Sequence, residues 1–169
     1  PHLVDPGRLW EGTKRAVGDQ ITHYVEPEAV PADRIREITD GDAVDLGDHT
    51  LMAHHVPGHA PHQVVFEDPA NDAVFTGDAA GLYVPERDRA EPSSPPPDFD
   101  LEQALEDVET IQELAPETLL YSHFGPTLRT HQLDGYSRRL EEWVEAVTSV
   151  RNELDDDDAV IEHFLDETV

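Results

Sequence analysis

The pattern of apolar and polar residues predicts a short helix at the start of the chain, followed by a loop and a hairpin. In DPGRLWEGTKRAVG, residues 5–18, Asp5 is a suitable N-cap, Pro6 suits the first helical position, and apolar residues recur on one face. Prolines and glycines then interrupt residues 21–56, with strand-like stretches after each glycine. This segment therefore reads as a loop and then a hairpin.

Three β-strands are predicted in quick succession between Leu51 and Asp78. The pattern is a strand, a histidine-rich turn, a second strand, the turn DPAND, and a third strand that ends in FTGD. A later apolar run, ETLLYSHFGPT, is typical of a buried strand that continues into a turn.

Two amphipathic helices are predicted in the second half of the chain. Asp100 and Gln103 form a start like a capping box, and apolar residues then recur at helical spacing as far as Leu114. A second apolar stripe, from Leu133 to Val147, marks the other helix. We expect both helices to lie on the same side of the sheet with their apolar faces inward.

Two segments show no periodic pattern. Residues 85–97 are rich in proline, serine and charge, which predicts a loop without regular structure. The residues from DDDD onward, 155–169, are expected to form an acidic tail.

With 169 residues, the chain has the length of one ordinary domain.

The charge balance excludes polyanionic partners. The net charge of -27 arises from 38 acidic and 11 basic residues, and Lys14 is the only lysine. No basic patch offsets phosphate repulsion, so we expect neither nucleic acid nor an anionic membrane as a partner. Acidic, lysine-poor surfaces are similar to those of proteins from salt-accumulating halophiles, in which concentrated salt screens self-repulsion. We therefore interpret the charge as a halophilic adaptation.

The absence of cysteine excludes disulfides, thiolate metal sites and a cysteine nucleophile, so a metal must bind histidines and carboxylates. No apolar run approaches the roughly 20 residues that a membrane span requires, and the N-terminus has no signal-peptide pattern. We expect a soluble cytoplasmic protein.

Three predicted strands end in residues of the types that bind metals. HHVPGHAPHQ, residues 54–63, places four histidines in one turn, FTGD ends in Asp78, and LLYSH ends in His123. A single histidine in a polar turn is more often structural, but strand ends can meet along one sheet edge. Imidazole and carboxylate suit zinc, and an aspartate can bridge two ions.

The ordered motifs VPGHAPHQVVF, VFTGDAA and LLYSHFGPT resemble those of the metallo-β-lactamase-fold hydrolases. The resemblance implies an α+β fold of the αββα sandwich type. It assigns metal-ligand roles to His59, Asp78 and His123, with Asp78 as the bridging and catalytic carboxylate. It also implies a dinuclear zinc site, with manganese or iron as alternatives, whose metal-activated hydroxide attacks an ester-like or thioester-like bond.

One part of the family pattern is missing. Complete members carry a His-x-His-x-Asp-His motif upstream of these ligands, and nothing in this chain matches it. We therefore expect residues 1–169 to be the C-terminal half of one metallo-β-lactamase-like domain, to bind metal weakly and to be inactive alone. A non-catalytic fragment that completes a partner's fold, or a binding module, stays open as an alternative.

The resemblance indicates a reaction type more closely than a substrate. A small-molecule thioester, as in glyoxalase II-like enzymes, is the least specific choice among the bonds that the family cleaves. We also expect self-association, because half of a sandwich would expose an apolar sheet face.

Other side chains near the predicted site receive secondary roles. We expect His55 to pack or to form a hydrogen bond beside the site rather than to bind metal, and His54 to point to the opposite side of its strand. His62 either lines the pocket or bonds a loop, and Tyr83 is expected to pack rather than to contact substrate. Surface positions are expected for His23, His49, His131 and His163.

Molar potassium chloride should raise the midpoint of thermal unfolding, because salt screens the repulsion among carboxylates that loosens the fold at low ionic strength. Melting curves from low to molar salt measure this effect. A midpoint that does not respond to potassium chloride would contradict the halophilic interpretation.

Overall fold

The computed structural model describes residues 2–93, 98–128, 130–154 and 156–166, and the chain forms two compact units, residues 1–38 and 39–169. The first unit contains the predicted N-terminal helix, α1 (Gly7–Val17). Pro6 is its N-cap, and Asp5 Oδ1 accepts a 3.3 Å hydrogen bond from the Gly7 amide, so the helix begins one residue later than predicted. Two 3₁₀ turns, Gly18–His23 and Ala32–Arg34, lie after α1.

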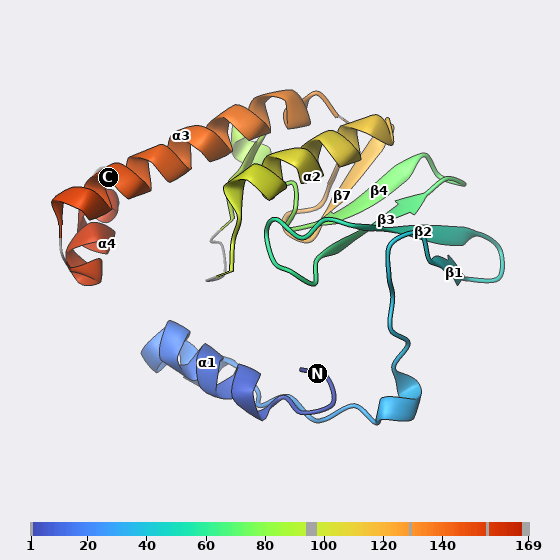
Figure 1. Ribbon diagram of the computed structural model, residues 1–169, viewed down its shortest axis with the longest axis horizontal. Helices are drawn as coiled ribbons and strands as arrows, with labels where there is room; N and C mark the ends of the chain where they lie inside the picture. Colours follow the sequence, from blue (N-terminus) through green and yellow to red (C-terminus); the bar gives the residue numbers. More distant parts are fainter. Residues whose placement is uncertain (1, 94–97, 129, 155, 167–169) are drawn as a thin grey trace. The chain divides into compact units, whose positions relative to one another are not determined.

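The second unit is built around a six-stranded sheet with the strand order β1-β2-β3-β4-β7-β8 (Figure 1). Neighbouring strands are antiparallel except β4 and β7, which are parallel and are joined by a long crossover. The predicted hairpin, the three successive strands and the later buried strand are confirmed. The strands are β1 (Ala43–Asp45), β2 (Thr50–His55), β3 (Val64–Asp68), β4 (Ala73–Gly77), β7 (Thr118–Tyr121) and β8 (Pro126–Thr127).

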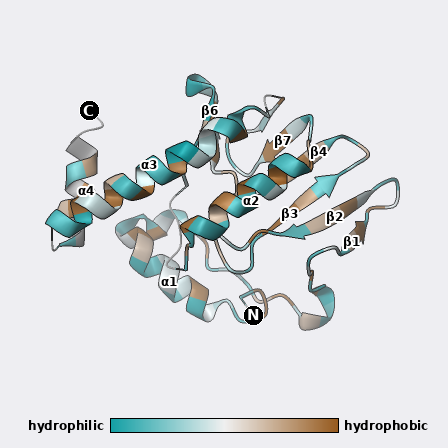
Figure 2. Cartoon of the chain, turned by 45° about the horizontal axis from the view of Figure 1, so that its top comes forward, coloured by the Kyte–Doolittle hydropathy of each residue, from teal (hydrophilic) through white to brown (hydrophobic). Residues whose placement is uncertain are grey.

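Helix α2 (Leu101–Glu113) contributes to the core on one side of this sheet (Figure 1). Asp100 caps it as predicted, because its Oδ1 accepts a 3.1 Å hydrogen bond from the Gln103 amide. Val108 and Ile111 are fully buried and belong to one cluster with sheet residues such as Val74 and Leu119. Figure 2 shows the resulting alternation of hydrophilic and hydrophobic positions along the helices.

Helix α3 (Gln132–Glu153) joins this core only through its first half. Leu133, Tyr136 and Leu140 are buried in the cluster. The later apolar side chains Trp143, Val144 and Val147 are only half-buried. The expected orientation of the whole stripe towards the sheet is wrong for the second half. A helix of 22 residues is about 33 Å long, more than the roughly 20 Å of the 13-residue helix α2 against which it packs. The helix packs against α2 and β6, and its C-terminal half extends beyond them (Figure 1).

The segment 85–97 contains regular structure, contrary to prediction. Its strand β6 (Arg89–Glu91) pairs antiparallel with β5 (Leu82–Val84), and the 3₁₀ turn Pro85–Arg87 lies between them. Ala90 is completely buried, so packing stabilises a strand whose three residues are too few to show a sequence period. The proline-rich residues 94–97 lie outside the described residues.

The expected acidic tail is partly helical. Helix α4 (Asp157–Asp166) occupies most of it, and Val160 is buried. Residues 155 and 167–169 lie outside the described part of the chain. Among the described residues, no helix combines the length and the hydropathy needed to cross a bilayer.

The sheet face opposite α2 carries a row of apolar side chains. The pairing register places Ala53, Phe66, Phe75, Leu120 and Pro126 side by side across five strands. Phe75, in the middle of the row, is 43% exposed. Such a row is typical of a face that packs against another surface.

Self-association stays a prediction, and this row is where we expect it. Light scattering in molar salt should detect a species larger than the monomer, and Phe75→Glu should shift it towards the monomer because a charge opposes burial of the row. Leu46→Glu is the matched control, because Leu46 is 51% exposed in the turn after β1, outside the row. A clean monomer at high concentration would show that this prediction is wrong.

Candidate metal centre

His59 lies in the turn between β2 and β3, which is closed by backbone hydrogen bonds. Its ends are joined by a 3.0 Å hydrogen bond from the Val56 amide to the Gln63 carbonyl, and the Gln63 amide donates to the Ala60 carbonyl at 2.9 Å. The side chain of His59 is only 14% exposed. The histidine-rich stretch is therefore an ordered turn that presents one mostly buried imidazole.

Helix α2 fixes this turn through Gly58. The Gly58 amide donates a 2.6 Å hydrogen bond to Asp107 Oδ2, and the Gly58 carbonyl accepts one of 2.9 Å from the Asp100 amide. A Cβ at residue 58 would collide with the backbone of Gln103 and Ala104. Only glycine lets the turn approach the helix this closely.

Asp78 follows β4 at the same end of the sheet. Gly77 has a positive φ of 54°, and a Cβ there would collide with the side-chain amide of Gln63, so the two ligand turns are in close contact. Asp78 Oδ1 is buried and accepts no hydrogen bond from the described residues. A buried carboxylate oxygen without a donor is costly unless another group neutralises it.

His123 comes from the turn after β7, two residues beyond Tyr121. Phe124 and Gly125 both have positive φ values, 65° and 99°, so the chain reverses directly after the histidine. The side chain of His123 is 53% exposed, and it is the most accessible of the three predicted ligands.

The structure brings the three predicted ligands together around Asp78. Its Oδ2 lies 3.8 Å from His59 Nε2, and its Oδ1 lies 3.7 Å from His123 Nε2. Both distances exceed hydrogen-bond length. They are close to the roughly 3.4 Å expected between two atoms that each lie about 2.1 Å from one tetrahedral ion. Each oxygen of Asp78 thus faces a different imidazole at a separation suited to a shared cation.

The site has two potential ligands per cation position rather than three. Within the described residues, no group of three histidine, aspartate or glutamate side chains could hold a single ion. A protein zinc site normally has three or four protein ligands. The arrangement therefore offers fewer ligands than a protein zinc site normally has.

The environment of His59 favours its neutral form. Burial lowers the pKa of His59 below the ordinary histidine value, the Asp78 carboxylate opposes this shift, and His62 adds to it. Ser93 Oγ lies 3.4 Å from His59 Nδ1. If Nε2 supplies its lone pair to a metal, Nδ1 carries the proton and donates towards Ser93.

Two of the other predicted side chains, His55 and Tyr83, make the contacts expected of them. His55 Nε2 lies 3.0 Å from the Pro61 carbonyl oxygen, which confirms a hydrogen-bonding role beside the site. His54 Nε2 lies 2.9 Å from Glu67 Oε2 of the neighbouring strand. His62 is exposed, and its role stays a prediction. Tyr83 packs as expected, because its ring stacks on Tyr121.

One surface assignment is wrong. His49 is half-buried, with Nδ1 2.7 Å from Asp48 Oδ1 and Nε2 3.4 Å from Asp68 Oδ2. Asp68 ends β3 on the next hairpin, so this contact joins two turns that sequence spacing does not connect. The other three histidines assigned to the surface are exposed, namely His23, His131 and His163.

Three contributors to the site were not predicted: Asp107, Ser93 and Gln63. Burial raises the pKa of Asp107, and hydrogen bonds from the Gly58 amide and Gln103 oppose that shift. The sequence gives one indication of the role of Asp107, because a charged residue stands next to Val108 on the apolar side of a predicted helix. Ser93 and Gln63 carry no comparable signal.

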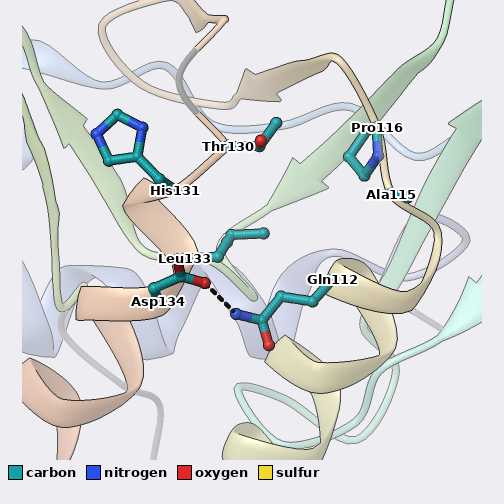
Figure 3. Close-up of a pocket in the computed structure, with 7 residues that line it drawn as sticks. All are labelled: Gln112, Ala115, Pro116, Thr130, His131, Leu133 and Asp134. Atoms are coloured by element: carbon teal, nitrogen blue, oxygen red, sulfur yellow. Dashed lines mark hydrogen bonds between the residues drawn. The ribbon is translucent and has the colours of Figure 1, made fainter.

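A separate surface pocket of about 530 Å³ lies where α2 ends and α3 begins (Figure 3). Gln112 Nε2 donates a 3.0 Å hydrogen bond to Asp134 Oδ1 across it, and Leu133 and His131 also line it. None of the three predicted ligands lines this pocket.

The chain belongs to the metallo-beta-lactamase superfamily, whose family model matches residues 2–123. The metallo-beta-lactamase fold-containing protein ST1585 of Sulfurisphaera tokodaii is 30% identical over 120 residues, which are 70% of this chain and 44% of that protein. The predicted family and fold class are thereby confirmed.

Solved structures show the same fold. The crystal structure of ST1585 from Sulfolobus tokodaii aligns with a TM-score of 0.61 and 25% identity over 83% of this chain and 50% of that one. TTHA1429 from Thermus thermophilus has a TM-score of 0.61 and 18% identity over 88% and 51% of the two chains. TTHA1623, solved in a di-iron-bound form, has a TM-score of 0.53 and 24% identity over 76% and 58%. The chain spans about half the length of the first two proteins.

Gly58→Ala should lower the free energy of unfolding by about 1–3 kcal/mol, because the added methyl group collides with helix backbone that cannot move aside. Gly12→Ala is the control, since it lies in helix α1 with open space around it and should stabilise by about 0.5–1 kcal/mol. Denaturant unfolding measures both. A Gly58→Ala variant as stable as the parent would show that the turn does not need its close approach to α2.

Proposed function

We propose that this chain carries half of the metal-binding edge of a metal-dependent hydrolase, with His59, Asp78 and His123 as ligands. Membership of the superfamily gives the broad class. The observation that carries the proposal is the position of Asp78, whose two oxygens each face a different imidazole nitrogen, at 3.8 and 3.7 Å. This is the spacing of ligands that share cations and not of hydrogen-bond partners.

The residues fit a divalent metal. The buried Asp78 Oδ1 lacks a hydrogen-bond donor among the described residues, and burial favours the neutral His59 that a metal requires. Imidazole and carboxylate suit zinc, manganese and iron alike. When bound, such ions lower the pKa of a water molecule and polarise the bond to be cleaved.

The chain's own residues would orient this chemistry. Asp78 holds negative charge between the two imidazoles, and Ser93 is placed to hold the His59 ring through Nδ1. We propose a small-molecule ester or thioester as the substrate, as in glyoxalase II-like members. The net charge of -27 disfavours a polyanionic substrate such as nucleic acid.

A second candidate function is supported by the small number of ligands. No group of three ligating side chains is present in the described part of the chain. This favours a non-catalytic chain that completes the fold of a partner, or a binding module. On this reading, zinc binds weakly and no ester or thioester is hydrolysed.

Titration with zinc, followed through the imidazole resonances of the histidines, tests the metal-binding proposal. We expect weak binding that shifts His59 and His123 together, and Asp78→Ala should weaken it at least about tenfold because each ion loses one of its two ligands. Asp33→Ala, which removes an exposed carboxylate from the first unit, should leave it unchanged.

Two outcomes would contradict parts of this proposal. Tight stoichiometric binding lost on Asp78→Ala would show that the chain holds a complete site. The absence of any shift at both histidines would refute their assignment as ligands. A panel of ester and thioester substrates with zinc, manganese or iron then separates the hydrolase from the non-catalytic alternative.

A further inference from the structure

We infer that Asp107 is a positioning residue for the metal centre: its carboxylate fixes the turn that carries His59 and thereby sets the separation of His59 from Asp78. The inference rests on the proposed function, since the position of the ring matters for chemistry only if the ring binds metal. Asp107 lies on α2, 49 residues from Gly58 in sequence, and acts through the backbone of the turn.

The burial of Asp107 requires an explanation. The residue is only 2% exposed, and its neighbours on the same side of α2, Ala104 and Val108, belong to the apolar core. An apolar side chain at this position would avoid the cost of desolvating a carboxylate. Both oxygens are instead occupied, Oδ2 by the Gly58 amide at 2.6 Å and Oδ1 by Gln103 Nε2 at 3.2 Å.

These contacts hold the backbone next to His59, the proposed metal ligand. Gly58 immediately precedes His59, and its carbonyl accepts a hydrogen bond from the Asp100 amide while its own amide donates to Asp107. The peptide groups on both sides of the Gly58 Cα are thus tied to α2. Loss of the Asp107 contact would release one of them. Metal-ligand distances are defined to about 0.2 Å, so a small displacement of the turn weakens binding.

A general stabilising role is the competing explanation, and a double-mutant cycle separates the two. If Asp107 acts through His59, its removal has no further effect on zinc affinity once His59 is absent. If Asp107 merely stabilises the whole unit, its removal weakens zinc binding equally in both backgrounds.

The experiment compares Asp107→Ala, which loses both hydrogen bonds, with Asp107→Asn, which keeps an oxygen for the Gly58 amide. Glu109→Ala is the matched control, because it removes a carboxylate from an exposed position of the same helix. Amide exchange at Gly58 and the His59 ring resonances are recorded without metal. Zinc is then titrated by calorimetry, which reports on both cation positions, so that His59→Ala and the double variant can be measured in the same way.

We expect Asp107→Ala to accelerate exchange at Gly58, to shift the His59 resonances and to weaken zinc binding by about 10-fold. Asp107→Asn should show smaller changes of the same kind, and Glu109→Ala none. If Asp107→Ala does not fold, as judged by circular dichroism, Asp107→Asn is used in the same cycle. Zinc affinity that is unchanged, or that falls equally in the His59→Ala background, would overturn the inference.

The outcomes also distinguish this inference from the proposed function. A parent chain that shows no zinc-dependent shift at either histidine refutes the metal assignment. The metal-free measurements then decide the positioning role alone. Retained protection of the Gly58 amide and unchanged His59 resonances in Asp107→Ala overturn it, whereas loss of both supports it.

Discussion

The close approach of the β2–β3 turn to helix α2 is the constraint on which the rest of the site depends. It requires a residue without a side chain at Gly58 and a buried acceptor for its amide, which Asp107 supplies. The same turn contacts the β4 end through Gln63 and Gly77. One helix surface therefore determines where His59 lies, and through Gln63 it also constrains the neighbouring turn that carries Asp78.

Much of the fold follows from local patterns. The strands between Leu51 and Asp78, the capped start of α2 and the strand before His123 are all readable, because each has a sequence period and a defined end. The strand β6 is not readable, because three residues show no period and neighbouring prolines and charges suggest a loop. The second half of α3 shows a different limit of prediction from sequence. An amphipathic stripe indicates that a helix has an apolar side, but not how much of that side finds a partner.

In the candidate site, too, residues in local motifs could be predicted, whereas residues that make tertiary contacts could not. His59, Asp78 and His123 could be predicted because each follows a strand and belongs to a recognisable motif. The contacts that support them depend on tertiary structure: the Asp107 contact with Gly58 joins residues 49 positions apart, and the approach of Ser93 to His59 joins residues 34 apart. The surface assignment of His49 is wrong for the same reason, since Asp68 belongs to another hairpin. The proposed ligands could therefore be identified from the sequence, whereas the residues that contact them could not.

The parallel pairing of β4 with β7 has a consequence for how the chain folds. Antiparallel neighbours such as β2 and β3 are joined by short turns and can form within microseconds. Phe75 and Leu120 pair across the long crossover that contains β5, β6 and α2, so the entropy cost of closing this loop delays the contact. Asp78 and His123 follow these two strands. The edge that gathers both residues is therefore among the last parts of the sheet to form, and the turn that carries His59 forms before Asp78 and His123 reach it.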